Sequence, residues 1–195
     1  MGAVRPPKRV KLIVGMLSGD PDLFRRARQH LERVLGPIDL ISELWPFECT
    51  DYYDGEMGPD LKRQFVTIAE LVRPERLPEI KRQTNHLEAA IRGELALTEE
   101  HRPVNLDPGY VTLGKLVLAT TKDYSHRVYI DQGVYAEVTL RFESGRWLPW
   151  PWTYPDYSAA TYHGFLIRVR ERLKEQLSDW GDGPKARPSG KGKPT

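Results

Sequence analysis

Cysteine and long hydrophobic runs are scarce in this sequence. Its single cysteine, Cys49, cannot form an internal disulfide, which is typical of a protein kept in a reducing cytoplasm. No segment reaches the ~18 consecutive apolar residues of a membrane-spanning helix, so we expect no membrane partner. The apolar run behind the basic N-terminus, residues 12–17, is too short for a signal peptide and is interpreted as part of a strand.

A charge of one sign is also lacking. The 29 Lys and Arg residues nearly balance the 27 Asp and Glu residues, so the composition indicates no general affinity for nucleic acid or anionic membranes. The sequence contains no Walker motif G-x-x-x-x-G-K-[ST], no His-x-x-x-His or Cys-x-x-Cys pair and no G-x-S-x-G elbow. We therefore expect no P-loop, no dedicated transition-metal site and no serine-hydrolase site.

The chain does have the composition of a globular protein, with 39% hydrophobic and 29% charged residues over 195 positions. This length suits one domain that buries roughly 70% of its unfolded surface and is short for two. We predict a single domain over residues 1–180. A disordered basic tail rich in Gly, Pro and Lys is predicted for residues 181–195.

Apolar periodicity predicts an α+β fold with an antiparallel sheet. The predicted elements are, in chain order, a strand at 10–17, a helix capped by Asp20, strands at 38–45 and 64–72, a helix at about 75–91 and a strand at 115–121. This β-α-β-β-α-β order is typical of ferredoxin-like folds. A hairpin then extends the sheet, and a C-terminal helix capped by Ser158 completes three helices.

The hairpin is the element that the local sequence predicts most clearly. A three-residue loop at 131–133 with a left-handed Gly133 places the following residues opposite one another: Ile130 and Val134, Val128 and Ala136, Tyr129 and Tyr135, Arg127 and Glu137. One face is then apolar, formed by Val128, Ile130, Val134, Ala136, Val138 and Leu140. The outer face carries the Arg127–Glu137 ion pair and the tyrosine pair.

Polar side chains gather where the strand at 115–121 ends and the hairpin begins. Lys122 and Arg127 suit a phosphate or carboxylate, and His126 suits proton transfer near neutral pH. Alternatively, His126 packs at the sheet margin as a structural residue. The predicted ligand-binding residues are Lys122, Arg127, Tyr129 and Tyr135.

Two further segments supply carboxylates. Residues 105–110, Asn-Leu-Asp-Pro-Gly-Tyr, predict a type II turn, in which Asp107 is either a base or metal ligand or an ordinary turn opener. The predicted catalytic residues are Asp107, His126 and Glu137. Asp51, Asp54 and Glu56 form an acidic loop that could hold Mg²⁺ with waters, or be a solvated turn between strands.

Several motifs together resemble one uncharacterised bacterial family. They are WPFECTDYYDGEMG, IKRQTNHLE, VNLDPGY, KLVLATTKDYSHRVYI, GVYAEVTL and WTYPDY, and the similarity spans roughly residues 11–173. The chain is identified as a member of the family carrying domain of unknown function 4416. The resemblance implies a small standalone cytoplasmic bacterial protein and assigns no activity or catalytic residue.

The leading functional hypothesis is an enzyme that binds a nucleotide or another phosphorylated ligand, with Mg²⁺ as a possible cofactor. One alternative is a non-catalytic module for single-stranded RNA, with Tyr129 and Tyr135 as its platform and Arg127 and Arg141 beside them. Another is a protein-interaction module using the aromatic segment 147–157. The sequence leaves the oligomeric state open.

Overall fold

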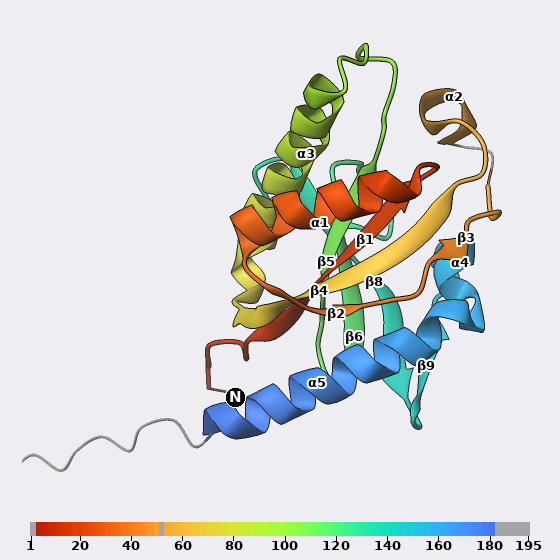
Figure 1. The fold of residues 1–195 in the computed structure, drawn as a ribbon. Helices are drawn as coiled ribbons and strands as arrows, with labels where there is room; N and C mark the ends of the chain where they lie inside the picture. The colour runs from red at the N-terminus through yellow and green to blue at the C-terminus, as the bar shows by residue number, and fades with distance from the viewer. Residues whose placement is uncertain (1–2, 51–52, 182–195) are drawn as a thin grey trace, which may run out of the picture.

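One antiparallel sheet of nine strands organises the part of the chain that the computed structural model describes, residues 3–50 and 53–181 (Figure 1). The strands are β1 (Val10–Ser18), β2 (Ile38–Ile41), β3 (Trp45–Pro46), β4 (Lys62–Val72), β5 (Asn105–Val111), β6 (Lys115–Thr120), β7 (Val128–Asp131), β8 (Val134–Glu143) and β9 (Arg146–Pro149). Their order is β2-β4-β1-β5-β6-β8-β7, and β3 pairs with β4 and β9 with β8. The antiparallel α+β class predicted from the sequence is confirmed.

Helices cover both faces of this sheet. The α-helices of the described residues are α1 (Pro21–Leu35), α2 (Asp54–Met57), α3 (Leu77–Glu94), α4 (Pro155–Ser158) and α5 (His163–Gly181). Apolar side chains of α1 and α3 pack with Val14 on one face, whereas those of α5 pack with Ile13 on the other. Figure 1 accordingly shows α1 beside α3, with α5 apart from both. None of the helices in these ranges is long and apolar enough to cross a membrane.

The strand predicted at 10–17 is the buried centre of the sheet. β1 pairs with β4 on one side and β5 on the other, and all nine of its residues are buried. The continuous apolar run is explained because both faces are covered. Helix α1 begins as predicted: the Asp20 side chain accepts a hydrogen bond from the Asp22 backbone N–H and caps the helix.

Several predicted boundaries are wrong. The strand expected at 38–45 is two short strands, β2 and β3. Ser158 ends the four-residue helix α4, and a 3₁₀ turn over Ala160–Tyr162 leads into α5, so Ser158 does not cap the last helix. Five α-helices replace the predicted three among the described residues, because α2 and α4 are single turns without a long apolar period. Of the predicted tail, Gly181 ends α5, and residues 182–195 lie outside the described ranges.

The turn predicted at residues 105–110 is instead strand β5. Pro108 lies opposite Val14 of β1, and Gly109 lies opposite Leu118 of β6. A Cβ on Gly109 would lie 2.3 Å from the Val117 carbonyl oxygen, so this glycine permits the close approach of two backbones rather than a turn. The ladder between β5 and β6 starts at Gly109, and Pro108 stands just where the two strands part.

The hairpin confirms part of its predicted register. Val128 pairs with Ala136 and Tyr129 with Tyr135, but Asp131, not Ile130, pairs with Val134. The loop is therefore a two-residue turn, in which Gln132 (φ 52°) and Gly133 (φ 76°) are both left-handed. A bulge between Tyr129 and Asp131 leaves Ile130 without a partner on β8. Because of this bulge, Val134 remains in the core although the turn has only two residues.

The two faces of the hairpin also differ from the prediction. A second irregularity, between Leu116 and Val117 of β6, moves Leu140 to the α5 side while Val138 stays on the α3 side. The Arg127–Glu137 ion pair forms, with 2.8 Å between Arg127 Nε and Glu137 Oε2, but it is buried rather than outward-facing. Segment 147–157 covers it, since Tyr154 accepts a hydrogen bond from Arg127.

A buried lysine ties the sheet to α5. Lys11 is fully buried, and its ammonium donates to Asp39 (2.5 Å), Gln176 (3.0 Å) and the Ala69 carbonyl (3.2 Å). These three contacts use all three donors of the ammonium group, which marks a structural role. Burial disfavours the ionised form of Asp39, but hydrogen bonds from Lys11 and Thr67 outweigh it and lower the pKa of Asp39 below 3.8.

We expect Asp39→Asn to reduce the dependence of the free energy of unfolding on pH at acidic pH. The unfolded carboxyl titrates near 3.8 and the folded one below it, so this stabilisation is present above that pH and is lost as pH falls through the folded pKa. Urea unfolding over a pH series, from about 6 to 2, measures this. Asp39→Asn should be less stable at neutral pH, because Lys11 loses its counter-ion, yet lose less free energy of unfolding on acidification. Equal slopes in both proteins would contradict the assignment.

Candidate active site

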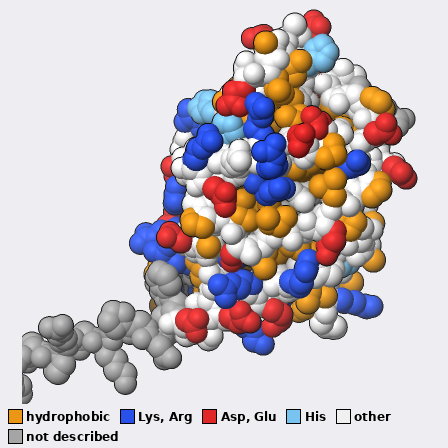
Figure 2. Space-filling model, in the orientation of Figure 1, with side chains coloured by type: hydrophobic (Ala, Val, Ile, Leu, Met, Phe, Trp, Pro, Cys, Tyr) orange, Lys and Arg blue, Asp and Glu red, His pale blue; other side chains and the backbone are white. Residues whose placement is uncertain are grey.

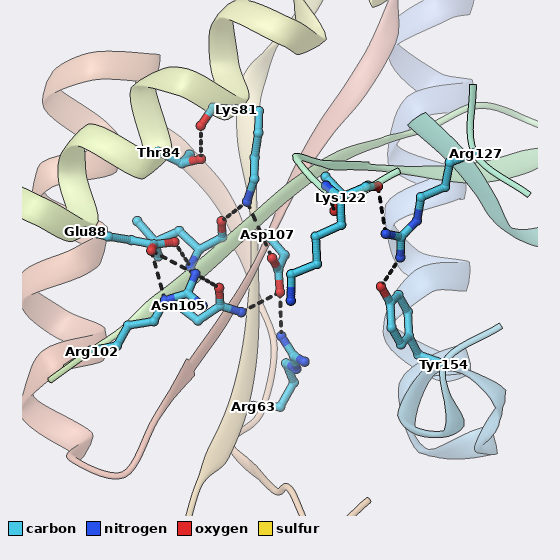
Figure 3. A network of polar contacts seen from close by, with 12 residues as sticks. Arg63, Lys81, Thr84, Glu88, Arg102, Asn105, Asp107, Lys122, Arg127 and Tyr154 are labelled. Carbon is cyan, nitrogen blue, oxygen red and sulfur yellow. Dashed lines mark hydrogen bonds and ion pairs between the residues drawn. The ribbon is translucent and has the colours of Figure 1, made fainter. Parts of the chain in front are cut away.

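A fork between β5 and β6 creates the polar centre of the molecule. Their ladder covers only residues 109–111 and 116–118, and β6 continues along β8 to Thr120. Asp107 lies on β5 two residues before the ladder, and Lys122 follows the end of β6. Figure 3 shows the Lys122 ammonium directed toward Asp107 across this fork.

Asp107 is surrounded by cations. Its carboxylate lies 3.5 Å from Arg63 Nη1 and 3.6 Å from Lys81 Nζ, and it accepts a hydrogen bond of 2.6 Å from Asn105. Burial disfavours its charge, but Lys81, Arg63 and Arg102 outweigh this and lower the pKa of Asp107. The side chain is still 29% exposed. Asp107 is therefore an ionised carboxylate that a ligand can reach.

Arg63 forms the buried floor behind Asp107. Its guanidinium bridges Asp107 and Asp156 (3.1 Å) and lies 5.0 Å from the centre of the Phe47 ring. Arg63 Nε and Nη1 and the Tyr157 hydroxyl are all buried without a hydrogen-bond partner. A Cβ at Gly15 would lie 3.1 Å from that hydroxyl and 3.4 Å from Nη1, so a larger residue there would press on the cluster.

The two carboxyl groups that contact Arg63 have pKa values shifted in opposite directions. Burial raises the pKa of Asp156 despite the opposing charge of Arg63, whereas the cations around Asp107 lower its pKa. Burial also raises the pKa of Tyr157 well above 10, so its hydroxyl remains a proton donor. Two neighbouring acids whose pKa values are shifted in opposite directions are typical of sites that transfer protons.

Arg102 connects Asp107 to an open cleft. It donates hydrogen bonds of 3.0 and 2.8 Å to Glu88, whose other oxygen accepts from the Leu106 backbone N–H at 2.7 Å. The cleft has a volume of about 560 Å³ and is lined by Glu56, Asn85, Glu88, Ala89, Arg92, Glu99, Glu100, Arg102 and Pro103. Its charged groups are mainly acidic, and its two cations are Arg92 and Arg102.

The predicted residues Arg127, His126 and Glu137 form a second cluster beside the fork. Arg127 donates to the Lys122 carbonyl at 2.9 Å and to the Tyr154 hydroxyl, while His126 Nε2 lies 3.3 Å from Glu137. Glu137 is thus shared by two basic side chains. These contacts tie the loop after β6 to segment 147–157 and place Tyr154 near Asp107, as Figure 3 shows.

His126 lies inside a stack of four rings. The order is Tyr124, His126, Trp152 and Trp150, with centroid separations of 6.1, 5.7 and 5.3 Å. Arg127 covers the Tyr124 ring at 4.7 Å and Arg141 covers Trp150 at 4.4 Å. Within the described residues both ends of this stack are occupied, which favours the structural reading of His126.

The remaining predicted residues lie on the hairpin, where Tyr135 pairs with Thr120 at the end of β6, or in the acidic segment. Tyr129 and Tyr135 contact each other edge to face, with centroids 5.5 Å apart. Glu56 lines the cleft; Asp51 lies outside the described residues, and the Asp54 side chain is not described. Among the described residues, no group of three or more His, Cys, Asp and Glu could hold a metal ion. The predicted Mg²⁺ site therefore stays a prediction.

Sequence reasoning missed four residues of the site, Arg63, Lys81, Arg102 and Asp156. One signal was present: Lys81 lies on the apolar stripe of α3, between Leu77 and Thr84, and it is buried there. A lysine at such a position needs a buried acceptor or counter-ion, which the structure supplies as the Leu106 carbonyl at 3.1 Å and Asp107. These two partners of Lys81 are far from it in the sequence, so the sequence did not identify them.

Surface charge does not single out another site on the face seen in Figure 2. Basic and acidic side chains are interspersed there, as expected for a net charge of +2. The fold and the fork define an α+β protein whose central feature is a reachable carboxylate in a buried basic cluster. The chain belongs to the family described as "Domain of unknown function (DUF4416)", whose model matches residues 8–173. No curated protein and no solved structure matches it.

Proposed function

We propose that this protein is an enzyme that binds a nucleotide or another small phosphorylated ligand at the β5–β6 fork. One observation carries the proposal: the ionised, partly exposed Asp107 lies between the buried cations Arg63 and Lys81, with the Lys122 ammonium directed toward it. Clustered cations of this kind hold anionic groups, and a fixed carboxylate beside them accepts a proton or a hydrogen bond from a ligand hydroxyl.

The proposal assigns different tasks to different side chains. Lys122 and Arg102 bind the phosphoryl group. The Arg102 side chain is 30% exposed. Asp107 orients a hydroxyl of the same ligand or takes up its proton, and the buried Lys81 and Arg63 keep the carboxylate ionised until it does so. Asp156 pairs with the other side of Arg63 at 3.1 Å and holds its guanidinium behind Asp107. Arg127 and Glu137 position Tyr154 and the Lys122 loop.

Mg²⁺ enters this proposal only through the acidic segment. Carboxylates at Asp51, Asp54 and Glu56 are suitable oxygen ligands, and Glu56 already lines the cleft that ends on Arg102. The thermal experiment below therefore includes each ligand with and without Mg²⁺.

The first part of the sheet supports a finer proposal about the fold. We propose that β1, α1, β2, β4, α3 and β5 form a ferredoxin-like unit. The support is the β-α-β-β-α-β order together with the antiparallel strand order β2-β4-β1-β5. The strand that completes it is β5, one element earlier than the sequence indicated.

RNA binding receives less support than a small ligand. The arginines expected to flank the tyrosine platform are engaged elsewhere: Arg127 is paired with Glu137, and Arg141 lies on Trp150. Of the tryptophans in segment 147–157, Trp147 is buried at 2% exposure and Trp152 is 37% exposed. Segment 147–157 thus combines a buried tryptophan with two exposed aromatic side chains, Trp152 and Tyr154 (42%).

A panel of nucleotides, sugar phosphates and inorganic phosphate, each with and without Mg²⁺, should identify the ligand by thermal shift. A ligand that binds only the folded state raises the melting temperature. We expect Lys122→Met to reduce the shift strongly, since a cation–phosphate contact of about 1.4 kcal/mol corresponds to a tenfold change in Kd.

Lys115→Met is the matched control, because Lys115 is an exposed lysine at the opposite end of the same strand. Its thermal shift should equal that of the wild type. If no phosphorylated compound shifts the wild type, or if both lysine variants respond alike, the proposed function is wrong.

A further inference from the structure

The outer strand β7 is an open apolar edge. It lies at one end of the sheet, β8 is its one partner among the described strands, and all four of its residues are exposed. Val128 is 69%, Tyr129 57% and Ile130 37% exposed. Edge strands of monomers usually carry charges, prolines or covering segments that prevent pairing with another chain. Val128, Tyr129 and Ile130 carry no charge and include no proline, although a bulge interrupts the strand between Tyr129 and the charged Asp131.

The opposite edge of the same sheet is protected. β2 carries Asp39, which forms ion pairs with Lys11 (2.5 Å) and with Arg172 of α5 (3.4 Å). These contacts lay α5 along that end of the sheet, and three of the four β2 residues are only partly exposed. The two edges therefore differ in the way expected if only one of them pairs with a partner.

We propose that β7 pairs antiparallel with β7 of a second copy of this chain, joining two sheets across a two-fold axis. The strand is self-complementary about Tyr129. In that register, Val128 of one copy lies opposite Ile130 of the other, and Arg127 lies opposite Asp131, so no like charges oppose one another. A two-fold contact of this kind needs no partner of different sequence.

The proposed interface contains few residues, so we expect it to be weak. Each copy contributes about five residues, and interfaces below the standard area of about 1,600 Å² are commonly weak. We therefore expect a dimer that dissociates on dilution. Tyr129 already packs edge to face on Tyr135, so its ring is held in place before pairing.

Light scattering coupled to size exclusion tests this with the full-length chain. At about 100 μM, chosen for an interface of micromolar strength, the wild type should have close to twice the 22.4 kDa mass of one chain. Tyr129→Lys places two ammonium groups at the two-fold axis and should give the mass of a single chain. Ile167→Lys, at a residue of α5 that is 39% exposed, is the control and should stay dimeric.

A cooperative thermal transition in each variant establishes that it is folded. A wild type that is monomeric at this concentration overturns the proposal and leaves β7 to a different partner. A Tyr129→Lys protein that remains dimeric also overturns it, since the dimer would then use another surface. Neither result bears on ligand binding at the fork, which is measured separately.

Discussion

Replacing Arg63 with methionine should lower the free energy of unfolding by about 3–5 kcal/mol, the usual cost of removing one partner from a buried ion pair. The guanidinium is 3% exposed and lies between two carboxylates, 3.5 Å from Asp107 and 3.1 Å from Asp156. Methionine fills a similar volume but leaves both acids without their shared cation. Urea unfolding monitored by circular dichroism measures the loss.

Two further variants separate this charge effect from packing. Arg63→Met combined with Asp156→Asn removes one of the stranded acids, so the double variant should recover part of the lost stability. Arg73→Met is the matched control, because Arg73 pairs with Glu75 at 3.7 Å with both side chains exposed. Its effect should stay within about 0.5 kcal/mol. A double variant less stable than the single one would contradict the shared-cation account.

Gly109→Ala should destabilise the protein by about 3 kcal/mol, at the upper end of the cost of overpacking. The new Cβ would lie 2.3 Å from the Val117 carbonyl oxygen and 2.7 Å from Leu118 Cδ2. Since the first of these atoms is backbone, no rotamer change relieves the contact, and β5 and β6 must separate. Chemical denaturation of purified protein gives the value.

Gly93→Ala is the appropriate comparison for that variant. Gly93 lies in α3, and no atom lies within 4 Å of a Cβ built there. Alanine has the higher helix propensity, so this change should raise stability by up to about 1 kcal/mol. If Gly109→Ala were as harmless as Gly93→Ala, the close approach of the two strands would not be a requirement of the fold.

Local sequence signals predicted the elements that depend on local physics. The central strand, the Asp20 cap and the apolar stripe of α3 are confirmed, because burial pattern and capping are properties of neighbouring residues. The Asp-Pro-Gly segment misled the prediction for the same reason. It has the local chemistry of a turn, but Gly109 serves a contact with β6 that only the tertiary structure reveals.

The candidate site was predictable only in part. Asp107, Lys122 and Arg127 stood out because each is a charged residue next to a recognisable strand or turn signal. Arg63 and Asp156 did not, because their significance comes from meeting each other across 93 positions of sequence. No period or motif indicates such a pairing.

The most direct test of the proposed function compares inorganic phosphate affinity in the wild type, Lys122→Met and Asp107→Asn at constant ionic strength. Removing the cation should weaken binding about tenfold, and neutralising the carboxylate beside the phosphate should tighten it several-fold, because the two charges act on the anion with opposite signs. That pair of opposite changes is the result that a phosphate site at the fork predicts. Affinities that are the same in all three proteins would contradict it.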